Sequence, residues 1–516
     1  MYVNMYASVF IDKVTEINNS INTFVWVTLG LALLIGTGIL MTLLTKFFQV
    51  FRFGHWMKET VGKLFTKKVT GHTGDNSSIS QFQALCTALA ATVGVGNIAG
   101  VAAAITLGGP GAIFWMWVAA FFGMMTNFSE NVLGIFYRRK VDGEWAGGAM
   151  YYLRDGLGAK KGCQWIGRVL AILFACFAIL ASFGIGNMGQ VNKIVSNLES
   201  AFDIPALSNV AVFDGVSLYA VIIGAVLMVL TGLIVIGGLQ RIANVAEKIV
   251  PAMIVLFIMG SLVIVGINYD RIGAAFASIF HFAFKNEAVW GGVAGVTLKQ
   301  VVTWGFKRGV FSNEAGLGSS VMVHSSSNVK EPVRQGMWGI FEVFADTMVI
   351  CTMTALVILT GGLVDLETGV LATGVTDATL VASTFRNVFG VAGEMFVAIA
   401  ILLFAFTTVL GWSQYGSKAV EYLGGKRAKQ IYKVVFVLLI MSGAVMTSSL
   451  AWDISDTFNG LMMIPNLIGV VVLSGQVRKI TKNYIDRKIK NKDVAPMLSY
   501  DARIQKQMED ELAADN

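Results

Sequence analysis

The stretch that decides the fold is QALCTALAATVGVGNIAGVAAAITLGG, residues 83–109, in which Gly94, Gly96 and Gly100 surround Asn97. Glycines and an asparagine near the middle of an apolar run lower the cost of leaving helical geometry. Because backbone groups in lipid must be satisfied internally, such a break is expected only where it lines a site. The N–H groups that it frees hold an anion, and the freed carbonyls hold a cation. The alternative is a helix-packing face, since Gly96 and Gly100 form a GxxxG motif, and that motif alone favours packing.

A second stretch of the same kind is TWGFKRGVFSNEAGLGSSVMVHSSS, residues 303–327. Its polar, glycine-rich centre contains Gly309, Ser312, Asn313, Gly316, Gly318 and Ser319. Glu314 lies among them, and an ionisable group at membrane depth costs about 2.5–3.5 kcal/mol on insertion scales, which makes it a candidate for function. The alternative for Glu314 is a structural pair with Lys307 or Arg308 that fixes the break.

The composition places both stretches in a membrane protein. Of the 516 residues, 55% are hydrophobic and 14% are charged, and the mean hydropathy is +0.67, whereas a soluble domain has about 25% charged residues. These values exclude an array of soluble domains, a disordered chain, a collagen and a disulfide scaffold. The net charge of +7 would suggest nucleic acid for a soluble protein. Here the basic residues cluster between apolar runs, so the expected partner is a lipid bilayer and not nucleic acid.

Apolar runs of about 20 residues are long enough to cross a hydrocarbon core. We predict about eleven of them, at 22–47, 81–108, 111–137, 165–197, 216–237, 243–267, 289–323, 335–361, 387–415, 431–449 and 459–476. The seventh is the weakest because charged residues interrupt it. The first is not a signal peptide, since it is too long and lacks a basic start. The predicted fold class is therefore an all-α polytopic membrane protein.

Charges in the loops predict the orientation of these spans. The loops after the first, third and ninth spans and the tail from about 477 are rich in Lys and Arg. The loops on the opposite side contain no Lys or Arg, but hold Glu199, Asp203, Asp214, Asp365, Glu367, Asp377, Asp453 and Asp456. By the positive-inside rule, the N-terminus lies outside the cell and the tail in the cytoplasm, with the spans in the plasma (bacterial inner) membrane.

The two interrupted spans begin two corresponding halves of five spans each. Since five is odd, the halves have opposite topology, and interrupted helices at matching positions of inverted halves indicate a transporter site near the bilayer midplane. We expect residues 81–267 to form the first repeat and 289–476 the second. Residues 1–80 then hold an extra helix and a basic loop, and 477–516 form the cytoplasmic tail.

Four blocks of sequence resemble one transporter family: TALAATVGVGNIAGVAAAITLGGPGAIFWMW, ASFGIGNMGQVNKI, GFKRGVFSNEAGLGSS and FTTVLGWSQYG. From about residue 50 to 475 the chain is similar to the alanine/glycine:cation symporters, also called sodium:alanine symporters. The resemblance implies a LeuT-type inverted-repeat fold, coupling to sodium (with protons in some members), and small neutral amino acids such as alanine and glycine as substrates.

The resemblance also implies roles for single residues. Substrate contacts are expected from Thr92, Val93, Gly94, Gly96, Asn97, Phe183, Gln190, Ser312, Asn313, Gly316, Thr408 and Trp412. Among these, Phe183 would form a wall of the pocket, and Gln190 would bind the polar groups of the amino acid. The alternative for Gln190 is an interhelical hydrogen bond, worth about 0.6 kcal/mol on average.

A sodium site is implied by the same comparison, with hydroxyl ligands from Thr407 and Thr408 and carbonyl ligands from Ala90 and Val93. Neutral oxygens suit a hard cation. Thr408 and Trp412 are four residues apart and share a helix face, so Trp412 would close the pocket. The alternatives are hydroxyls bonded to their own helix and a tryptophan at the membrane interface.

Buried acids form a separate group of candidates. Glu342 and Asp346 share one helix face and should not point at lipid. They are expected to pair with Lys307, Arg308 or another base, to gate the site or to relay a proton. The same possible roles apply to Glu130. For these three and Glu314 we expect a structural or gating role.

Other classes of function fit the sequence less well. His55, His72, His281 and His324 have no metal-ligand spacing, and no nucleophile or phosphate-binding motif stands at a credible turn, so an enzyme is not expected. A channel would need a repeated pore motif or a charged ring. The main alternative is a proton-coupled amino acid carrier of the same fold, in which the acids matter more than Thr407 and Thr408. No organic cofactor and no obligatory protein partner are expected.

Overall fold

The computed structural model describes residues 2–64, 66–71, 78–213, 215–284, 297–372, 377–446 and 450–514 of the protein. Asp214, His72 and the start of the seventh predicted span, 289–296, lie outside these ranges. The described strands form two short hairpins, β1 (Arg139–Val141) with β2 (Glu144–Ala146) and β3 (Ala211–Phe213) with β4 (Val216–Ser217). The remaining regular structure is helical, which confirms the predicted fold class.

The helices differ widely in length. The long ones and their continuations are α1 (Tyr2–Thr23), α2 (Gly30–Leu44), α6 (Gln81–Thr92), α7 (Val101–Gly108), α8 (Ala112–Phe136), α10 (Gln164–Phe183), α11 (Gly189–Ala201), α13 (Leu218–Val235), α14 (Gly238–Ile267), α16 (Leu298–Asn313), α18 (Pro332–Val343), α19 (Thr352–Thr360), α21 (Val391–Ala444) and α22 (Leu450–Val472). The connecting and terminal ones are α3 (Phe48–Phe51), α4 (Phe53–Glu59), α5 (Lys67–Thr70), α9 (Ala149–Tyr151), α12 (Pro205–Ser208), α15 (Ile272–Phe284), α17 (Val321–His324), α20 (Asp377–Phe389), α23 (Ser474–Lys488) and α24 (Ala502–Ala514). Several of them are joined by short π-helices, η1 (Phe24–Leu29), η3 (Gly96–Gly100), η4 (Tyr152–Leu157), η5 (Gly184–Met188) and η7 (Phe344–Cys351). Two short 3-10 helices are η2 (Val61–Lys63) and η6 (Tyr269–Arg271).

Within the described ranges, eight helices are long and apolar enough to cross a membrane, and one bent pair raises that number to nine. One of the eight, α21, has 54 residues. At 1.5 Å per residue it is more than twice as long as the roughly 30 Å hydrocarbon core. Gly425 interrupts it with φ 71° and ψ −168°, and the predicted spans 387–415 and 431–449 lie on its two sides.

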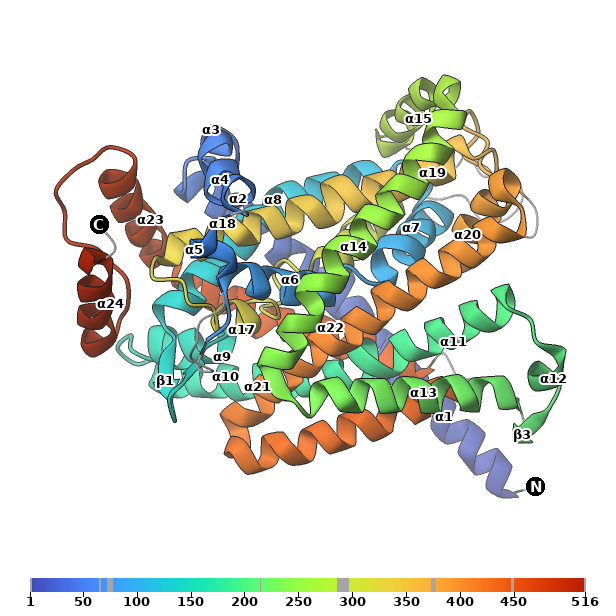
Figure 1. The fold of residues 1–516 in the computed structure, drawn as a ribbon, viewed down its shortest axis with the longest axis horizontal. Coiled ribbons are helices and arrows are strands. Elements are labelled where there is room, and N and C mark those ends of the chain that lie inside the picture. The colour runs from blue at the N-terminus through green and yellow to red at the C-terminus, as the bar shows by residue number, and fades with distance from the viewer. Residues whose placement is uncertain are drawn as a thin grey trace.

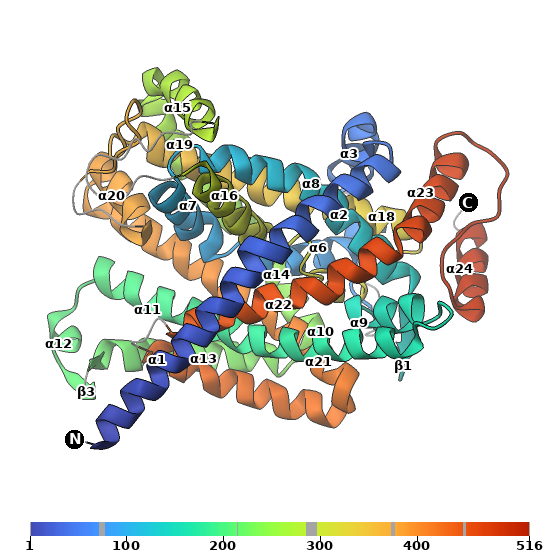
Figure 2. The same ribbon diagram turned by 180° about the vertical axis from the view of Figure 1, so that it is seen from behind.

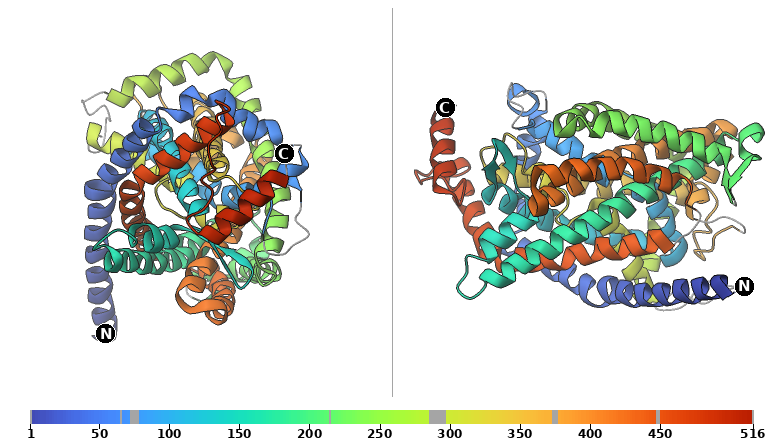
Figure 3. Two further views of the ribbon diagram at one scale, coloured as in Figure 1. Left: turned by 90° about the vertical axis from the view of Figure 1, so that its left-hand side faces the viewer. Right: turned by 90° about the horizontal axis from the view of Figure 1, so that it is seen from below.

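The two ends of the chain lie at opposite ends of the helix bundle (right view in Figure 3). The rod formed by α1, η1 and α2 runs obliquely across one face, beside α22 (Figure 2). The last helices, α23 and α24, project at the other end (Figure 1). There α24 packs Ile504 and Met508 against Trp145 of β2, so the tail is folded onto the hairpin.

Both helices that carry the predicted breaks begin with the same capping arrangement. Ser80 accepts a hydrogen bond from the backbone of Gln83, whose side chain caps Ser80 in return, ahead of α6. Thr297 and Gln300 form the same reciprocal pair ahead of α16. Each capping box satisfies two donors at a helix start and thereby fixes where the helix begins. The lengths of the two helices before their breaks are therefore set by sequence.

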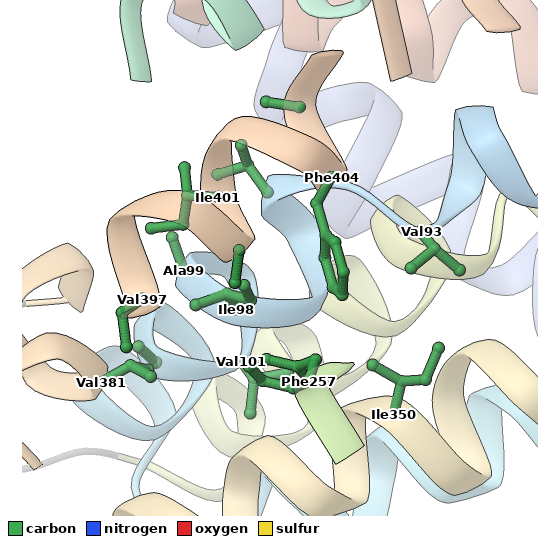
Figure 4. Packing of buried hydrophobic residues seen from close by; sticks show 14 of the residues in the cluster. Val93, Ile98, Ala99, Val101, Phe257, Ile350, Val381, Val397, Ile401 and Phe404 are labelled. Atoms are coloured by element: carbon green, nitrogen blue, oxygen red, sulfur yellow. The ribbon is translucent and has the colours of Figure 1, made fainter. Parts of the chain in front are cut away.

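The apolar core surrounds the first break. Val93, Ile98 and Val101 lie in one cluster with Phe257 of α14 and Phe404 of α21 (Figure 4). A broken helix lacks the backbone hydrogen bonds that stabilise a continuous one. Close packing against neighbouring helices compensates for this loss and holds the break in place.

Candidate functional site

The first predicted break is present, and it exposes backbone carbonyls. The last helical hydrogen bond of α6 runs from the N–H of Val93 to the carbonyl of Leu89, at 2.8 Å. The next N–H, of Gly94, donates to Oδ1 of Asn97 at 2.9 Å. The chain resumes helical geometry in η3, and the two parts are bent by 53°. The carbonyls from Ala90 to Val93 are thus the unpaired carbonyls of a helix end, inside the protein.

Thr408 of α21 lies directly against this break. A Cβ placed on Gly94 would be only 2.4 Å from the Thr408 hydroxyl oxygen, so only glycine permits the approach. The Thr408 hydroxyl donates to the carbonyl of Phe404 at 2.9 Å, which leaves its oxygen free to accept or to ligate. Thr407 donates to the carbonyls of Leu403 and Phe404, at 3.0 Å each.

A small cavity is enclosed at this point. Seven predicted residues line it: Thr92, Gly94, Gly96, Gln190, Glu314, Thr408 and Trp412. Ala91, Ile185, Phe311 and Asn459 complete the wall. The space open to the centre of a water-sized sphere is about 20 Å³, little more than the roughly 10–15 Å³ that one water needs. The polar side chains around it are at most 3% exposed, so the cavity is closed.

Gln190 supplies an unsatisfied acceptor at the cavity. Its amide N–H donates to the carbonyl of Ile185 at 3.0 Å, and its side chain is nearly inaccessible. The amide oxygen has no hydrogen-bond partner among the residues that the structure describes. A buried acceptor without a partner is unfavourable by about 1–3 kcal/mol, and a ligand that donates a hydrogen bond removes that cost.

Trp412 closes the cavity on the side of α10 and η5. A Cβ on Gly186 would meet the Trp412 side chain at 2.5 Å, so that side chain packs directly against the backbone there. Its ring stands edge-on to Tyr415, with 5.3 Å between centroids. Packing on both sides fixes the indole, which therefore limits the size of a ligand.

Asp346 joins the two broken helices. Its carboxylate accepts hydrogen bonds from Asn97 at 2.6 Å, from Ser312 at 2.8 Å and from Thr347 at 2.8 Å. Asn313 donates to Thr347 at 3.0 Å and extends the network. Three of the predicted substrate residues, Asn97, Ser312 and Asn313, thus hold the breaks together and do not line the cavity.

The remaining predicted residues also lie away from the cavity wall. The side chain of Val93 belongs to the apolar core in Figure 4. Phe183 packs against Tyr432, with ring centroids 5.1 Å apart. Gly316 has a φ of 93°, which shapes the second break. Ala90 is fully buried, and only its carbonyl is available for a ligand.

Of the partners suggested for the buried acids, Lys307 bonds elsewhere, whereas Glu342 has another base, His324, beside it. Lys307 forms an ion pair with Asp456 at 2.8 Å and also donates to Asn22. Glu314 instead accepts from Ser319, and Glu342 lies 3.0 Å from Nε2 of His324. Lys307 lies one turn or more before the break, so its side chain reaches the N-terminal rod and α22 rather than the acids.

Glu130 belongs to a third buried network. The Asn466 amide donates to Glu130 and, at 2.8 Å, to the carbonyl of Gly316 in the second break. Tyr152 donates to the Asn466 side-chain oxygen. The network ties α8, α22 and the second break together, as a structural role requires.

Comparison with known proteins decides the family. A model of the sodium:alanine symporter family matches residues 11–497. The sodium/alanine symporter AgcS of Methanococcus maripaludis is 43% identical over 469 residues, which cover 90% of this chain and 96% of the relative. The chain belongs to the sodium:alanine symporter family. It is accordingly a multi-pass membrane transporter and not an enzyme.

Further carriers and one solved structure are also similar to the chain. A putative sodium/proton-dependent alanine carrier of Bacillus subtilis, YrbD, is 35% identical over 483 residues, covering 90% of this chain and 91% of the relative. The probable sodium/glutamine symporter GlnT of the same organism is 35% identical over 474 residues, covering 92% and 91%. The crystal structure of MhsT in complex with L-phenylalanine superposes with a TM-score of 0.53 at 14% identity and covers 79% of this chain and 99% of that one. That likeness confirms the LeuT-type fold.

In this family member, sequence reasoning missed part of the cavity wall. Ile185, Phe311 and Asn459 line it; Phe311 and Ile185 are apolar residues inside the quoted blocks, whereas Asn459 lies outside them. Ile185 lies in the block ASFGIGNMGQVNKI, next to Gly186, and that proximity was the only available signal. Asn459 is one polar residue in an apolar span, and such residues usually pair with other helices.

Proposed function

We propose that the protein is a sodium-coupled symporter that imports alanine and glycine by alternating access. The observation that carries the proposal is the closed cavity between the first break, Thr408 and Gln190. It combines unpaired backbone groups with one unpartnered amide oxygen and has very little volume. In this closed form the cavity holds about one water, so it has to widen for any amino acid, and the smallest zwitterions need the least widening.

The proposed cation position lies between the carbonyls of Ala90 and Val93 and the hydroxyl of Thr408. All three are neutral oxygens, which a hard cation prefers and which need no buried countercharge. Thr407 contributes a fourth oxygen if its hydroxyl turns away from the carbonyls of its own helix. Sodium bound here would hold the break against α21 and fix the shape of the adjoining cavity.

The proposed amino acid position is this cavity once it has widened from its closed form. The substrate carboxylate faces the backbone N–H groups of Val95 and Gly96, where the helix restarts and a positive end of the dipole lies, since the N–H of Gly94 already donates to Asn97. The ammonium donates to the free oxygen of Gln190. Trp412 limits the side chain to a hydrogen or a methyl group. Because sodium and substrate share the break, each stabilises the geometry that the other needs.

Alternating access would follow from movement of the first two helices of each repeat, around the two breaks, against the rest of the bundle. We assign the repeats to residues 81–267 and 289–476, with 1–80 as an additional helix and loop and 477–516 as the tail. The loop charges support a cytoplasmic tail and an external N-terminus. Coupling is the difference in ligand affinity between the two states.

Proton coupling is the second candidate, and Asp346 is the observation that favours it. This carboxyl group is fully buried, has no cationic partner among the described residues, and accepts hydrogen bonds from both broken helices. A proton on Asp346 would remove an acceptor and loosen the two breaks together. Under proton coupling, Asp346→Asn abolishes the dependence on the gradient, whereas under sodium coupling Thr408→Ala does so.

The test is uptake of labelled alanine and glycine into proteoliposomes that hold the purified protein. An inward sodium gradient is imposed with and without a proton gradient, and a choline gradient serves as the control. The proposal expects accumulation that requires sodium and stops when the sodium gradient is dissipated. Accumulation driven by the proton gradient in sodium-free buffer would contradict sodium coupling and support the second candidate.

A further inference from the structure

A second and larger cavity opens at the end of the bundle that the basic loops predict to be cytoplasmic. Its volume is about 560 Å³. Its walls come from the bend between α13 and α14, from α21 on both sides of Gly425, and from β2. In Figure 1 the bend between α13 and α14 lies beside the turn of α21. It shares no lining residue with the cavity at the first break.

The N-terminus of α14 points into this second cavity. The helix has 30 residues, and no side chain caps its first turn. Gly237 through Arg241, its first residues, line the cavity. An uncapped helix start presents unpaired N–H groups and the positive end of the helix dipole. These features favour an anion but do not by themselves define a site.

The side chain of Lys433 also indicates an anion site, independently of the helix start. The residue is only 4% exposed, it lines the cavity, and it has no hydrogen bond or ion pair among the residues that the structure describes. Its ammonium lies 3.7 Å from the position of a Cβ on Gly238, beside the start of α14. The Lys433 ammonium has no partner among the described side chains and faces the cavity, so an anion bound there would complete its contacts.

The other basic residues of the cavity are largely compensated. Lys429 pairs with Glu421 at 3.0 Å and lies 3.8 Å from Glu144. Lys418 donates to the carbonyl of Trp145 at 3.0 Å. The Arg241 guanidinium donates to the carbonyl of Leu233 at 2.6 Å and retains its charge.

We propose that this cavity binds a phosphate group between Lys433, Arg241 and the N-terminus of α14. Four basic residues and one acid line the cavity, and Glu421 beside it pairs with Lys429, which leaves two positive charges in excess. A phosphate group, with one to two negative charges and several acceptor oxygens, matches two cations and a row of N–H groups better than a single carboxylate does. The site is independent of which cation drives transport.

The surroundings favour a phospholipid as the source of the phosphate. Leu233 on α13 and Ile236 directly after it are 61% and 62% exposed, and Ile431 beside Lys433 is 66% exposed. Large apolar side chains exposed next to a basic pocket are expected where acyl chains meet the protein, and such pockets hold acidic head groups. Soluble phosphate offers the same oxygens, so the experiment separates the two sources.

The experiment uses the full-length protein purified in detergent. Equilibrium binding of radiolabelled inorganic phosphate is measured, and native mass spectrometry follows retention of phosphatidylglycerol against phosphatidylcholine. Lys433→Met removes the buried charge while keeping the side-chain length. Arg241→Gln changes an exposed position, so this variant is expected to fold normally. Lys426→Met, on the same helix but outside the cavity, is the matched control.

We expect at least one of the two probes to bind the wild-type protein, and to bind Lys433→Met about tenfold or more weakly. Arg241→Gln should weaken the same probe, and Lys426→Met should leave it unchanged. Binding of phosphatidylglycerol alone identifies the lipid as the source, whereas binding of inorganic phosphate identifies a soluble one. If the wild-type protein binds neither probe, or if Lys433→Met binds as tightly as the wild type, the site does not exist.

Discussion

The two broken helices leave helical geometry in different ways. At the first break the chain leaves the helix for only two residues, Val93 and Gly94, and then continues helically as far as Gly108. At the second, Glu314 adopts a left-handed φ of 55°, Gly316 and Gly318 follow with φ of 93° and 72°, and the next helix has four residues. The first break therefore presents backbone to a cavity, whereas the second is a longer turn that buried acids hold in place.

The glycines at the two breaks therefore have different roles, although the motifs are similar. Gly94 is needed because Thr408 lies against it, and its φ is not in the left-handed region. Gly316 is needed because its own backbone is left-handed. Substitution at the first break should thus impair transport in a folded protein, while substitution at the second should impair folding itself.

The largest expected effect on transport is from Gly94→Ala. The added methyl group would lie 2.4 Å from the Thr408 oxygen, so the break and α21 must separate, which removes the proposed cation position. We expect sodium-driven alanine uptake to fall to background while the protein still purifies as a folded monodisperse species. Gly100→Ala is the matched control, because a Cβ there meets nothing within 4 Å, and its uptake should be near normal. Normal uptake by Gly94→Ala would refute the close contact.

Thr408→Ala should have the next largest effect. It removes a neutral oxygen from the proposed sodium position but leaves the backbone of the break intact. The sodium concentration for half-maximal uptake should rise about tenfold or more, and Thr408→Ser should restore it. Thr384→Ala provides the comparison, because Thr384 is buried and bonded to its own helix in the same way, at 2.9 Å, but lies away from the cavity. Equal sodium dependence in both alanine variants would argue against the assignment.

Gly316→Ala tests the second break. A left-handed backbone strains an alanine by about 1–3 kcal/mol, and the methyl group would also approach Leu34 to 2.4 Å. We expect a lower melting temperature in detergent and a smaller yield. Gly36→Ala, in the middle of α2 with open space around it, should melt at or above the wild-type temperature. If Gly316→Ala is as stable as the wild type but inactive, the two breaks do not differ as described.

The smallest expected effect is at Glu59, which anchors α4 to α18 through Arg334. Glu59 accepts hydrogen bonds from Lys63 at 2.7 Å and from Arg334 at 2.9 Å. Burial raises the pKa of Glu59, but these two cations outweigh burial and hold that pKa below its ordinary value. A lowered pKa adds stability above about pH 4.3, and that stability is lost as the pH falls through the lowered value.

Glu59→Gln should accordingly lower the melting temperature slightly at neutral pH, by the equivalent of about 1 kcal/mol or less. The difference from the wild type should shrink as the pH falls below about 4.3, and it should vanish below the lowered pKa of Glu59, where the folded wild-type carboxylate is also neutral. Glu367→Gln, at an exposed loop position, is the control and should follow the wild type at every pH. A gap between Glu59→Gln and the wild type that widens in acid would reverse the sign of this argument.

Much of the fold could be predicted from the sequence, because hydropathy and glycine position act locally. The span near Ala112–Phe136 and the break at Gly94 both follow from residues within a few positions of one another. Charge pairing could not be predicted in this way. Lys307 meets Asp456, and Asp346 meets Asn97, across separations of more than a hundred residues that only the packing of the helices brings together.

In the candidate site, too, the roles that depend on local backbone could be predicted, whereas those that depend on distant partners could not. Residues whose role comes from the backbone, such as Gly94 and Gly96, line the cavity as the motif predicts. Polar residues in the same motifs, Asn97 and Ser312, were expected at the substrate but bond to Asp346 instead. A motif identifies where the helix breaks, but the direction of each side chain depends on which neighbour offers an acceptor.

The most direct test of the account is the linkage between sodium and alanine in the purified wild-type protein. Alanine affinity is measured by equilibrium binding in saturating sodium and in choline, each at two pH values. If sodium and alanine share the first break, sodium should tighten alanine binding about tenfold or more, and alanine should tighten sodium binding by the same factor. Alanine affinity that is the same in sodium and in choline, and that changes only with pH, would contradict the central claim.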